Sequence, residues 1–209
     1  LQFRGEFYRH TLMTPFFTPD KSDLGDFGRP NIWLAGVGEL MTRTAGEVCD
    51  GFICHGFTTE KYLREVTLPN LAEGRERAGK TMDDFMISGP FFVVSGTTEE
   101  EFETAMQATK QQIAFYGSTP AYAKVFECHG WEDLQPRLNT LSKQGDWVGM
   151  GELIDDEVLN AFAVVGEPSQ IAPGLKERYG DVVDRISFYA PGQGDITAYR
   201  SVMDELKAG

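Results

Sequence analysis

Residues 31–59 constrain the fold more than any other part of the sequence. A short apolar run at residues 32–35 precedes a glycine turn at residues 36–38, and apolar residues then recur at helical spacing as far as Val48. A second apolar run, residues 52–54, follows directly. This succession predicts a β-strand, an α-helix and a second β-strand that are joined by very short turns. The two strands of such a unit run parallel, so we expect a parallel sheet covered by helices.

The rest of the chain extends this alternation, with one interruption. Apolar runs predict further strands at residues 85–94 and 182–189, and helical periods follow Thr58 or Thr59 and the acidic stretch at residues 99–101. Pro69 falls inside the first of these helices and should kink or break it. Four parallel strands with helices fit an open α/β sheet and half of an eight-stranded barrel equally well.

We divide the 209 residues as one domain with four parts. Residues 1–30 predict a hairpin and a long loop, and residues 31–116 predict β/α units. Residues 117–160 break the rhythm and predict an insertion of two or three short helices. Residues 161–209 predict the last β/α units, with a final helix at residues 195–207 that buries Tyr199, Val202, Met203 and Leu206. Because the chain begins at Leu1 in what reads as the middle of a domain, we expect it to be incomplete.

Composition excludes several classes of protein. The net charge of −13 argues against nucleic acid and anionic membranes as partners. No apolar run approaches the ~20 residues of a membrane span, and we find no secretory signal. Three cysteines without ligand-like spacing predict reduced thiols in a cytoplasmic protein and no metal site. We therefore expect a small-molecule substrate as partner, and we leave a homodimer open.

Five segments in this order resemble the luciferase-like monooxygenase superfamily. Within it, the chain is most similar to the oxidoreductases of actinobacteria that depend on coenzyme F420, a deazaflavin. The segments are RPNIWLAGVGELMTRTAGEVCDGFI, TTEKYLREVTLPNLAEG, QQIAFYGSTPAY, VVGEPSQIAPGL and VDRISFYAP.

The resemblance implies a fold and a reaction. It implies the C-terminal half of a (β/α)8 barrel, with strands five to eight and an insertion after strand seven. Members of the superfamily bind the deazaflavin or FMN at the carboxyl ends of the strands and transfer a hydride to or from its ring. The implied function is hydride transfer between F420 and a small organic substrate. The alternatives are an FMN-dependent monooxygenase of the same fold and a truncated or cofactor-free paralogue without activity.

Two loops supply the candidate cofactor-binding residues. A glycine turn that leads into a helix leaves backbone N–H groups free for a phosphate, although many α/β proteins have such a turn without a ligand. The resemblance places the cofactor's phosphate at this turn and a ligand contact at His55, which otherwise reads as a solvated loop histidine. The expected cofactor-binding residues are Ala35, Gly36, Val37, Gly38, Leu40, Met41, His55, Gly56 and Thr58.

The catalytic residues remain unknown at this point. Cys128 and His129 are adjacent, but neighbouring side chains point in different directions and seldom form a nucleophile–base pair. His10 lies in the predicted hairpin, and Tyr189 at the end of a strand could contact a ring but fits core packing better. The acidic run at residues 155–157 reads as the start of a helix, and we expect no metal there.

Overall fold

A computed structural model describes residues 2–18, 20, 25–192 and 199–208. The contacts divide the chain into two units, residues 1–31 and residues 32–209, and we describe each by itself. The first unit contains a hairpin in which β1 (Phe3–Arg4) pairs antiparallel with β2 (Arg9–His10), followed by the 3₁₀ helix η1 (Pro15–Phe17). The parts of the expected hairpin and loop at residues 1, 19 and 21–24 lie outside the described residues.

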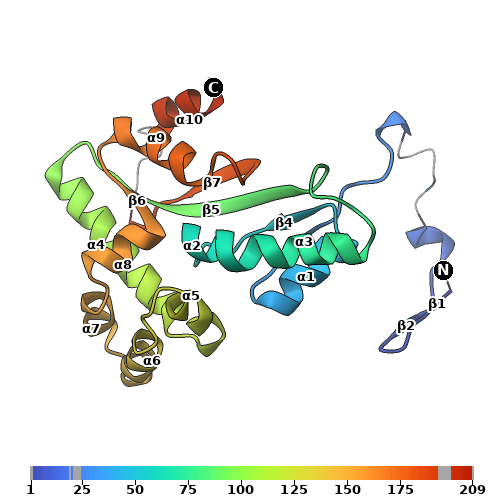
Figure 1. Cartoon of the computed structure of the whole chain (residues 1–209), viewed down its shortest axis with the longest axis horizontal. Helices are drawn as coiled ribbons and strands as arrows, with labels where there is room; N and C mark the ends of the chain where they lie inside the picture. The colour runs from blue at the N-terminus through green and yellow to red at the C-terminus, as the bar shows by residue number, and fades with distance from the viewer. Residues whose placement is uncertain (1, 19, 21–24, 193–198, 209) are drawn as a thin grey trace. The chain divides into compact units, whose positions relative to one another are not determined.

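The second unit is built on a parallel sheet, which confirms the predicted fold class (Figure 1). Its strands are β3 (Trp33–Ala35), β4 (Gly51–Ile53), β5 (Met86–Val94), β6 (Ala163–Val165) and β7 (Arg185–Tyr189). Ser88 pairs with Ile53 of β4 and with Arg185 of β7, so these two strands lie on opposite sides of β5. The sequence analysis did not predict β6, which pairs with the last three residues of β5.

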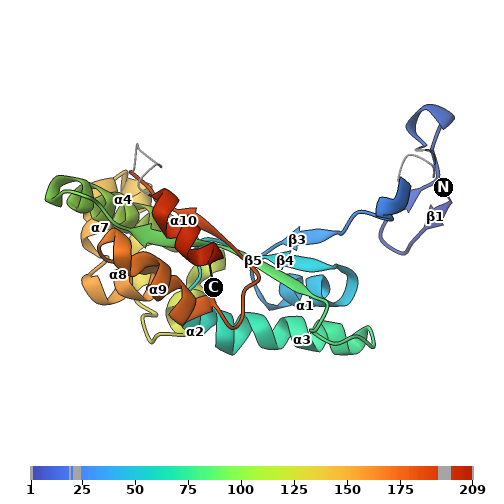
Figure 2. The same cartoon turned by 90° about the horizontal axis from the view of Figure 1, so that it is seen from above.

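Helices connect the strands and cover the sheet (Figures 1 and 2). The helix α1 joins β3 to β4, a long helical run joins β4 to β5, and the helices α4 to α8 lie between β5 and β6. The helical elements of this unit are α1 (Glu39–Val48), α2 (Glu60–Tyr62), the π-helix η3 (Leu63–Thr67), α3 (Leu68–Arg77), α4 (Glu99–Gly117), the 3₁₀ helix η4 (Pro120–Tyr122), α5 (Ala123–Glu127), α6 (Leu134–Gln144), α7 (Trp147–Glu152), α8 (Asp156–Phe162), α9 (Pro168–Tyr179) and α10 (Arg200–Lys207). Among these described helices, none combines the length and the apolar character that crossing a bilayer requires.

Of the kink or break that was predicted at Pro69, the break does not occur, because the helical run continues from α2 through η3 into α3. The N–H of Leu68 bonds the carbonyl of Leu63, five residues earlier, which is the bond of a π-turn. Pro69 follows directly and lies in the first turn of α3. A residue of a first turn donates no hydrogen bond within its helix, so the missing N–H of proline costs nothing there. The wider turn therefore accommodates the proline.

Two details of the last elements also differ from expectation. The helices α5 to α8 make the insertion richer in short helices than the two or three that were predicted. In α10, Val202 is buried and Leu206 packs against the core, but the side chain of Met203 is 36% exposed. Residues 195–198 of the predicted final helix lie outside the described residues.

Two hydrophobic clusters fill the second unit. One joins α1, α3, α9 and α10 to one face of the sheet, and its largest side chains include Phe52, Leu71, Phe91 and Tyr179. The other joins the helical insertion to the carboxyl end of β5 around Phe92. The insertion is therefore anchored to the same end of the sheet at which the β3–α1 and β4–α2 connections lie.

Two glycines let α1 and α3 approach each other closely. A methyl group on Gly46 of α1 would overlap the carbonyl of Leu71, and one on Gly74 of α3 would overlap the carbonyl of Arg43. Backbone carbonyls cannot swing away as a flexible side chain can. The pair therefore fixes the separation of the two helices, and with it the position of the α1 N-terminus.

We expect Gly74→Ala to destabilise the protein by about 1–3 kcal/mol, because the added methyl group overpacks the α1–α3 contact. Urea unfolding followed by circular dichroism measures the change. Gly151→Ala in α7 is the matched control, since its new methyl group would meet only the flexible side chain of Gln111 at 3.2 Å. Equal unfolding midpoints for Gly74→Ala and wild type would contradict the role of this contact.

Candidate functional site

The glycine turn connects β3 to α1 and leaves the first amides of α1 without a side-chain cap. Gly38 is the N-cap residue and has a φ of +78°, a conformation that L side chains rarely adopt. Its carbonyl oxygen accepts hydrogen bonds from the backbone N–H of Thr42 at 3.1 Å and from Oγ1 of Thr42 at 2.8 Å. Because glycine has no side chain, Gly38 offers no side-chain acceptor to the N–H groups of the first helical turn. This end of α1 therefore offers hydrogen-bond donors and a positive dipole end.

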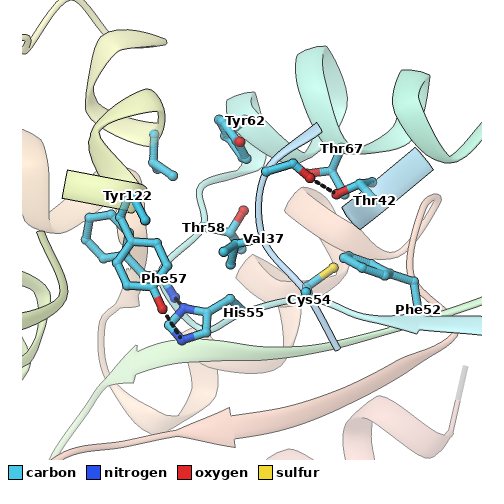
Figure 3. Close-up of a pocket in the computed structure, with 14 residues that line it drawn as sticks. Val37, Thr42, Phe52, Cys54, His55, Phe57, Thr58, Tyr62, Thr67 and Tyr122 are labelled. Carbon is cyan, nitrogen blue, oxygen red and sulfur yellow. Dashed lines mark hydrogen bonds between the residues drawn. The ribbon is translucent and has the colours of Figure 1, made fainter. Parts of the chain in front are cut away.

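The glycine turn that precedes these amides borders a cavity of about 30 Å³ at the carboxyl ends of β3 and β4. Its lining residues come from the glycine turn, α1, the β4–α2 loop, the helical run after that loop, and the start of the insertion (Figure 3). They are Gly36, Val37, Gly38, Thr42, Phe52, Cys54, His55, Phe57, Thr58, Tyr62, Thr67, Ala121, Tyr122 and Val125. One water needs about 10–15 Å³ of such volume, so the cavity accommodates about two water-sized groups. It can hold the end of a ligand but not a whole flavin.

His55 is fixed in this cavity by three contacts. Its Nδ1 accepts a hydrogen bond from the backbone N–H of Phe57 at 3.0 Å, and its ring stacks on Tyr122 with centroids 4.9 Å apart. The rings of Tyr116 and His55 meet in a T-shaped arrangement, with centroids 4.9 Å apart. Because Nδ1 is an acceptor, the proton of the neutral imidazole lies on Nε2, which is 3.4 Å from the Tyr122 hydroxyl oxygen (Figure 3). Burial lowers the pKa of His55, so the neutral form prevails at pH 7.

The β4–α2 loop is tied to the insertion through Thr59. Oγ1 of Thr59 caps α2 by accepting the N–H of Tyr62 at 3.1 Å, and it lies 2.8 Å from Nε2 of His129. His129 in turn stacks on Trp131 with centroids 4.4 Å apart. These contacts hold the loop that carries His55 and Thr58.

Cys128 and His129 do not form a nucleophile–base pair. Sγ of Cys128 points to a carboxylate oxygen of Glu65 at 3.7 Å, while His129 contacts Thr59. Burial, together with the charge of Glu65, raises the pKa of the Cys128 thiol, which opposes formation of a thiolate.

An ion pair joins α1 to the insertion near the cavity. Nζ of Lys124, in α5, is 2.5 Å from Oε1 of Glu39, the first residue of α1. The hydrogen bond and the charge of Lys124 lower the pKa of Glu39. Lys124 thereby offsets the negative charge that Glu39 adds beside the free amides of the helix.

The structure gathers only part of the expected binding set. Gly36, Val37, Gly38, His55 and Thr58 line the cavity. Four other expected residues do not: Ala35, Leu40, Met41 and Gly56. Leu40 and Met41 are 72% and 42% exposed, because the first turn of α1 presents these side chains to solvent. Gly56 lies against the ring of Tyr189 instead.

Sequence reasoning missed several residues of the cavity wall, chiefly Thr42, Phe57, Tyr62 and Tyr122. Tyr62 falls in the helix predicted after Thr58 or Thr59 and Tyr122 in the predicted insertion, and neither prediction indicated that the two line one cavity. Only the preference of aromatic residues for ligand sites could have pointed to them, and that signal is weak in a chain with 12% aromatic residues.

The acidic run at residues 155–157 begins a helix, as predicted from sequence. Asp155 is the N-cap of α8 and accepts the N–H of Val158 at 2.9 Å. Within the described part of the chain, no group of three or more His, Cys, Asp or Glu side chains is arranged to hold a metal ion.

Comparison with protein families gives one extended match and several relatives. The model of the luciferase-like monooxygenase family matches residues 1–185. An uncharacterized protein of Mycobacterium tuberculosis is 48% identical over 200 residues, which are 95% of this chain and 58% of the relative. An F420-dependent glucose-6-phosphate dehydrogenase of Nocardia farcinica is 30% identical over 92% of this chain and 50% of the relative. A 5,10-methylenetetrahydromethanopterin reductase of Methanopyrus kandleri is 25% identical over 69% of this chain and 40% of the relative. The chain thus spans roughly half the length of these proteins.

Solved structures share the fold. The coenzyme F420-dependent tetrahydromethanopterin reductase from Methanopyrus kandleri superposes with a TM-score of 0.69 at 22% identity, over 85% of this chain and 50% of the other. An EDTA monooxygenase from a Chelativorans species gives a TM-score of 0.55 at 18% identity, over the whole of this chain and 50% of the other. The parallel sheet therefore corresponds to half of a luciferase-like (β/α)8 barrel.

We expect the imidazole of His55 to titrate below its ordinary pKa of 6.5, because burial disfavours the charged ring. A ring-proton NMR titration measures the midpoint. Between the lowered pKa and 6.5 the unfolded chain binds more protons than the folded protein. The contribution of His55 to the free energy of unfolding therefore falls as pH decreases through this window. His55→Gln should remove that part of the pH dependence, and a midpoint above 6.5 would contradict the assignment of Nδ1 as an acceptor in a neutral ring.

Proposed function

Because this chain belongs to the luciferase-like monooxygenase family, we propose that it is the cofactor-phosphate-binding part of an oxidoreductase that uses coenzyme F420. The reaction is a hydride transfer between the deazaflavin and a small organic substrate, in the cytoplasm. Neither a nucleic acid nor a membrane takes part. The relatives support F420, since both the glucose-6-phosphate dehydrogenase and the tetrahydromethanopterin reductase that are similar over most of this chain depend on F420.

The observation that carries the proposal is the uncapped N-terminus of α1 beside a cavity with neutral donors. F420 and FMN both carry a phosphate at the end of a sugar-alcohol chain. The free amides and the helix dipole suit that phosphate. His55 can add an N–H from Nε2, and Thr58, 5% exposed in the cavity wall, can add a hydroxyl.

The residues present fit such a group. A Cβ at Gly38 would find no atom within 4 Å, so the space above the turn is open to a phosphate oxygen. A Cβ at Gly36 would lie 3.2 Å from Cβ of Met41, so the turn packs tightly against the first turn of the helix. The small cavity can receive about two of the phosphate oxygens, and the remainder of the cofactor must extend beyond it.

The roles of cofactor and protein then separate. When bound, the deazaflavin supplies the site that accepts or donates the hydride. The described residues of this chain bind and orient it: the turn amides hold the phosphate, and the fixed rings of His55 and Tyr122 wall the cavity. His129, bonded to Thr59, does not line this cavity. We assign no catalytic role to the residues that line it.

The test is a binding titration with F420 and FMN on the protein produced from its complete gene. We expect Gly38→Val to weaken F420 binding at least tenfold, about 1.4 kcal/mol, because a β-branched side chain would strain the turn and fill the space for the phosphate. Fluorescence of the deazaflavin reports the dissociation constant.

Gly79→Val is the matched control. Gly79 also has a positive φ, +67°, and open space around it, but it follows α3 and is not part of the cavity wall. The same strain should thus affect folding in both variants and F420 binding only in Gly38→Val. Tight binding of FMN and none of F420 would replace F420 by FMN, and unchanged affinity in a folded Gly38→Val protein would remove the turn from the site.

A further inference from the structure

A pair of phenols lies next to the cavity without being part of its wall. Tyr189 is the last residue of β7, and Tyr116 is near the carboxyl end of α4. Their hydroxyl oxygens are 2.8 Å apart. The rings of Tyr116 and His55 are in T-shaped contact, so the phenol pair lies directly beside a residue of the cavity wall.

Packing holds both rings in place. Tyr189 stacks on Phe92, its register partner in β5, with centroids 4.6 Å apart and an interplanar angle of 16°. Gly56 makes this position available, because a Cβ there would lie 2.8 Å from Cδ1 of Tyr189. Gly56 belongs to the loop that carries His55 and Thr58. The lack of a side chain at Gly56 thus brings the strand-end phenol against the cofactor-binding loop.

The pair has hydrogen-bonding capacity to spare. One hydroxyl donates a hydrogen bond to the other oxygen, and the second hydroxyl can donate a hydrogen bond to a third group. Both side chains are half-buried rather than sealed in the core. A ligand atom can therefore complete the network.

The surroundings make this a neutral subsite. Burial and the bond to Tyr116 raise the pKa of Tyr189, so its hydroxyl keeps its proton. His55 beside it is also neutral, because burial lowers its pKa. The phenol pair therefore presents neutral O–H donors and no positive charge of its own, which suits hydroxyl or carbonyl oxygens better than a phosphate or a carboxylate.

We propose that the Tyr116–Tyr189 pair, next to His55, is a second subsite that binds hydroxyl or carbonyl oxygens in the phosphate-free part of the same cofactor. This inference rests on the proposed function. The site then has two ends: an anion-binding end at the amides of α1 and a neutral, oxygen-binding end at the carboxyl terminus of β7. The small cavity explains why a second end is needed, since it accommodates about two water-sized groups, which is no more than part of the phosphate.

The test separates the two ends with three probes: F420, its phosphate-free deazariboflavin core, and inorganic phosphate as a competitor. We expect Tyr189→Phe and Tyr116→Phe each to weaken binding of F420 and of the core by about five- to tenfold, the usual loss for one hydrogen bond. The inhibition constant of inorganic phosphate should not change. Gly38→Val should show the reverse pattern, with weaker F420 and phosphate binding and unchanged core binding.

Tyr179→Phe is the matched control, because Tyr179 is a buried tyrosine that stacks on Phe91 in the other hydrophobic cluster. Thermal unfolding of each variant shows that the fold is kept, and phenylalanine preserves the ring stacking. Wild-type affinity for the core in both folded phenol variants would overturn the inference while leaving the proposed function intact. If the wild-type protein binds neither F420 nor FMN, the proposed function fails and this inference fails with it.

Discussion

The strand β5 is the element on which the rest of the structure depends. Its nine residues pair with β4 and β6 along one edge and with β7 along the other. Because all of these pairings are parallel, the carboxyl ends of β3, β4 and β7 lie toward the same end of the sheet. The glycine turn, His55 and Tyr189 each follow or end one of these strands. The site is therefore a consequence of strand direction, as in other barrels of this kind.

Close packing then sets the finer positions. Gly46 and Gly74 fix α1 against α3, which determines where the free amides of α1 point. The hydrogen bond between Thr59 and His129 and the ion pair between Glu39 and Lys124 attach the insertion to the loops around the cavity. The insertion is therefore part of the site, because it contributes Tyr122 to the cavity wall.

Local signals predicted what is local. The period of apolar residues predicted β3, α1 and β4, and the glycine turn predicted the uncapped helix end. Contacts between distant segments left no comparable trace. Tyr122 stacks on His55 from 67 residues away, and Tyr189 meets Tyr116 across 73 residues. The strand β6 begins at Ala163, directly after α8 ends at Phe162, so no turn residues separate it from the apolar residues of the helix. The break that was one of two outcomes expected at Pro69 does not occur, because a change to a π-turn accommodates its missing N–H.

The central claim is that the amides at the start of α1 hold the phosphate of a deazaflavin cofactor. The most direct measurement is a ¹⁵N-HSQC titration of the protein with F420, followed at the backbone amides of Gly38, Glu39 and Leu40. We predict that the resonances of these three amides shift most, and that they move downfield because the phosphate accepts hydrogen bonds from their N–H groups. Inorganic phosphate should shift the same resonances. Binding of F420 that leaves these amides unchanged and shifts others instead would contradict the account.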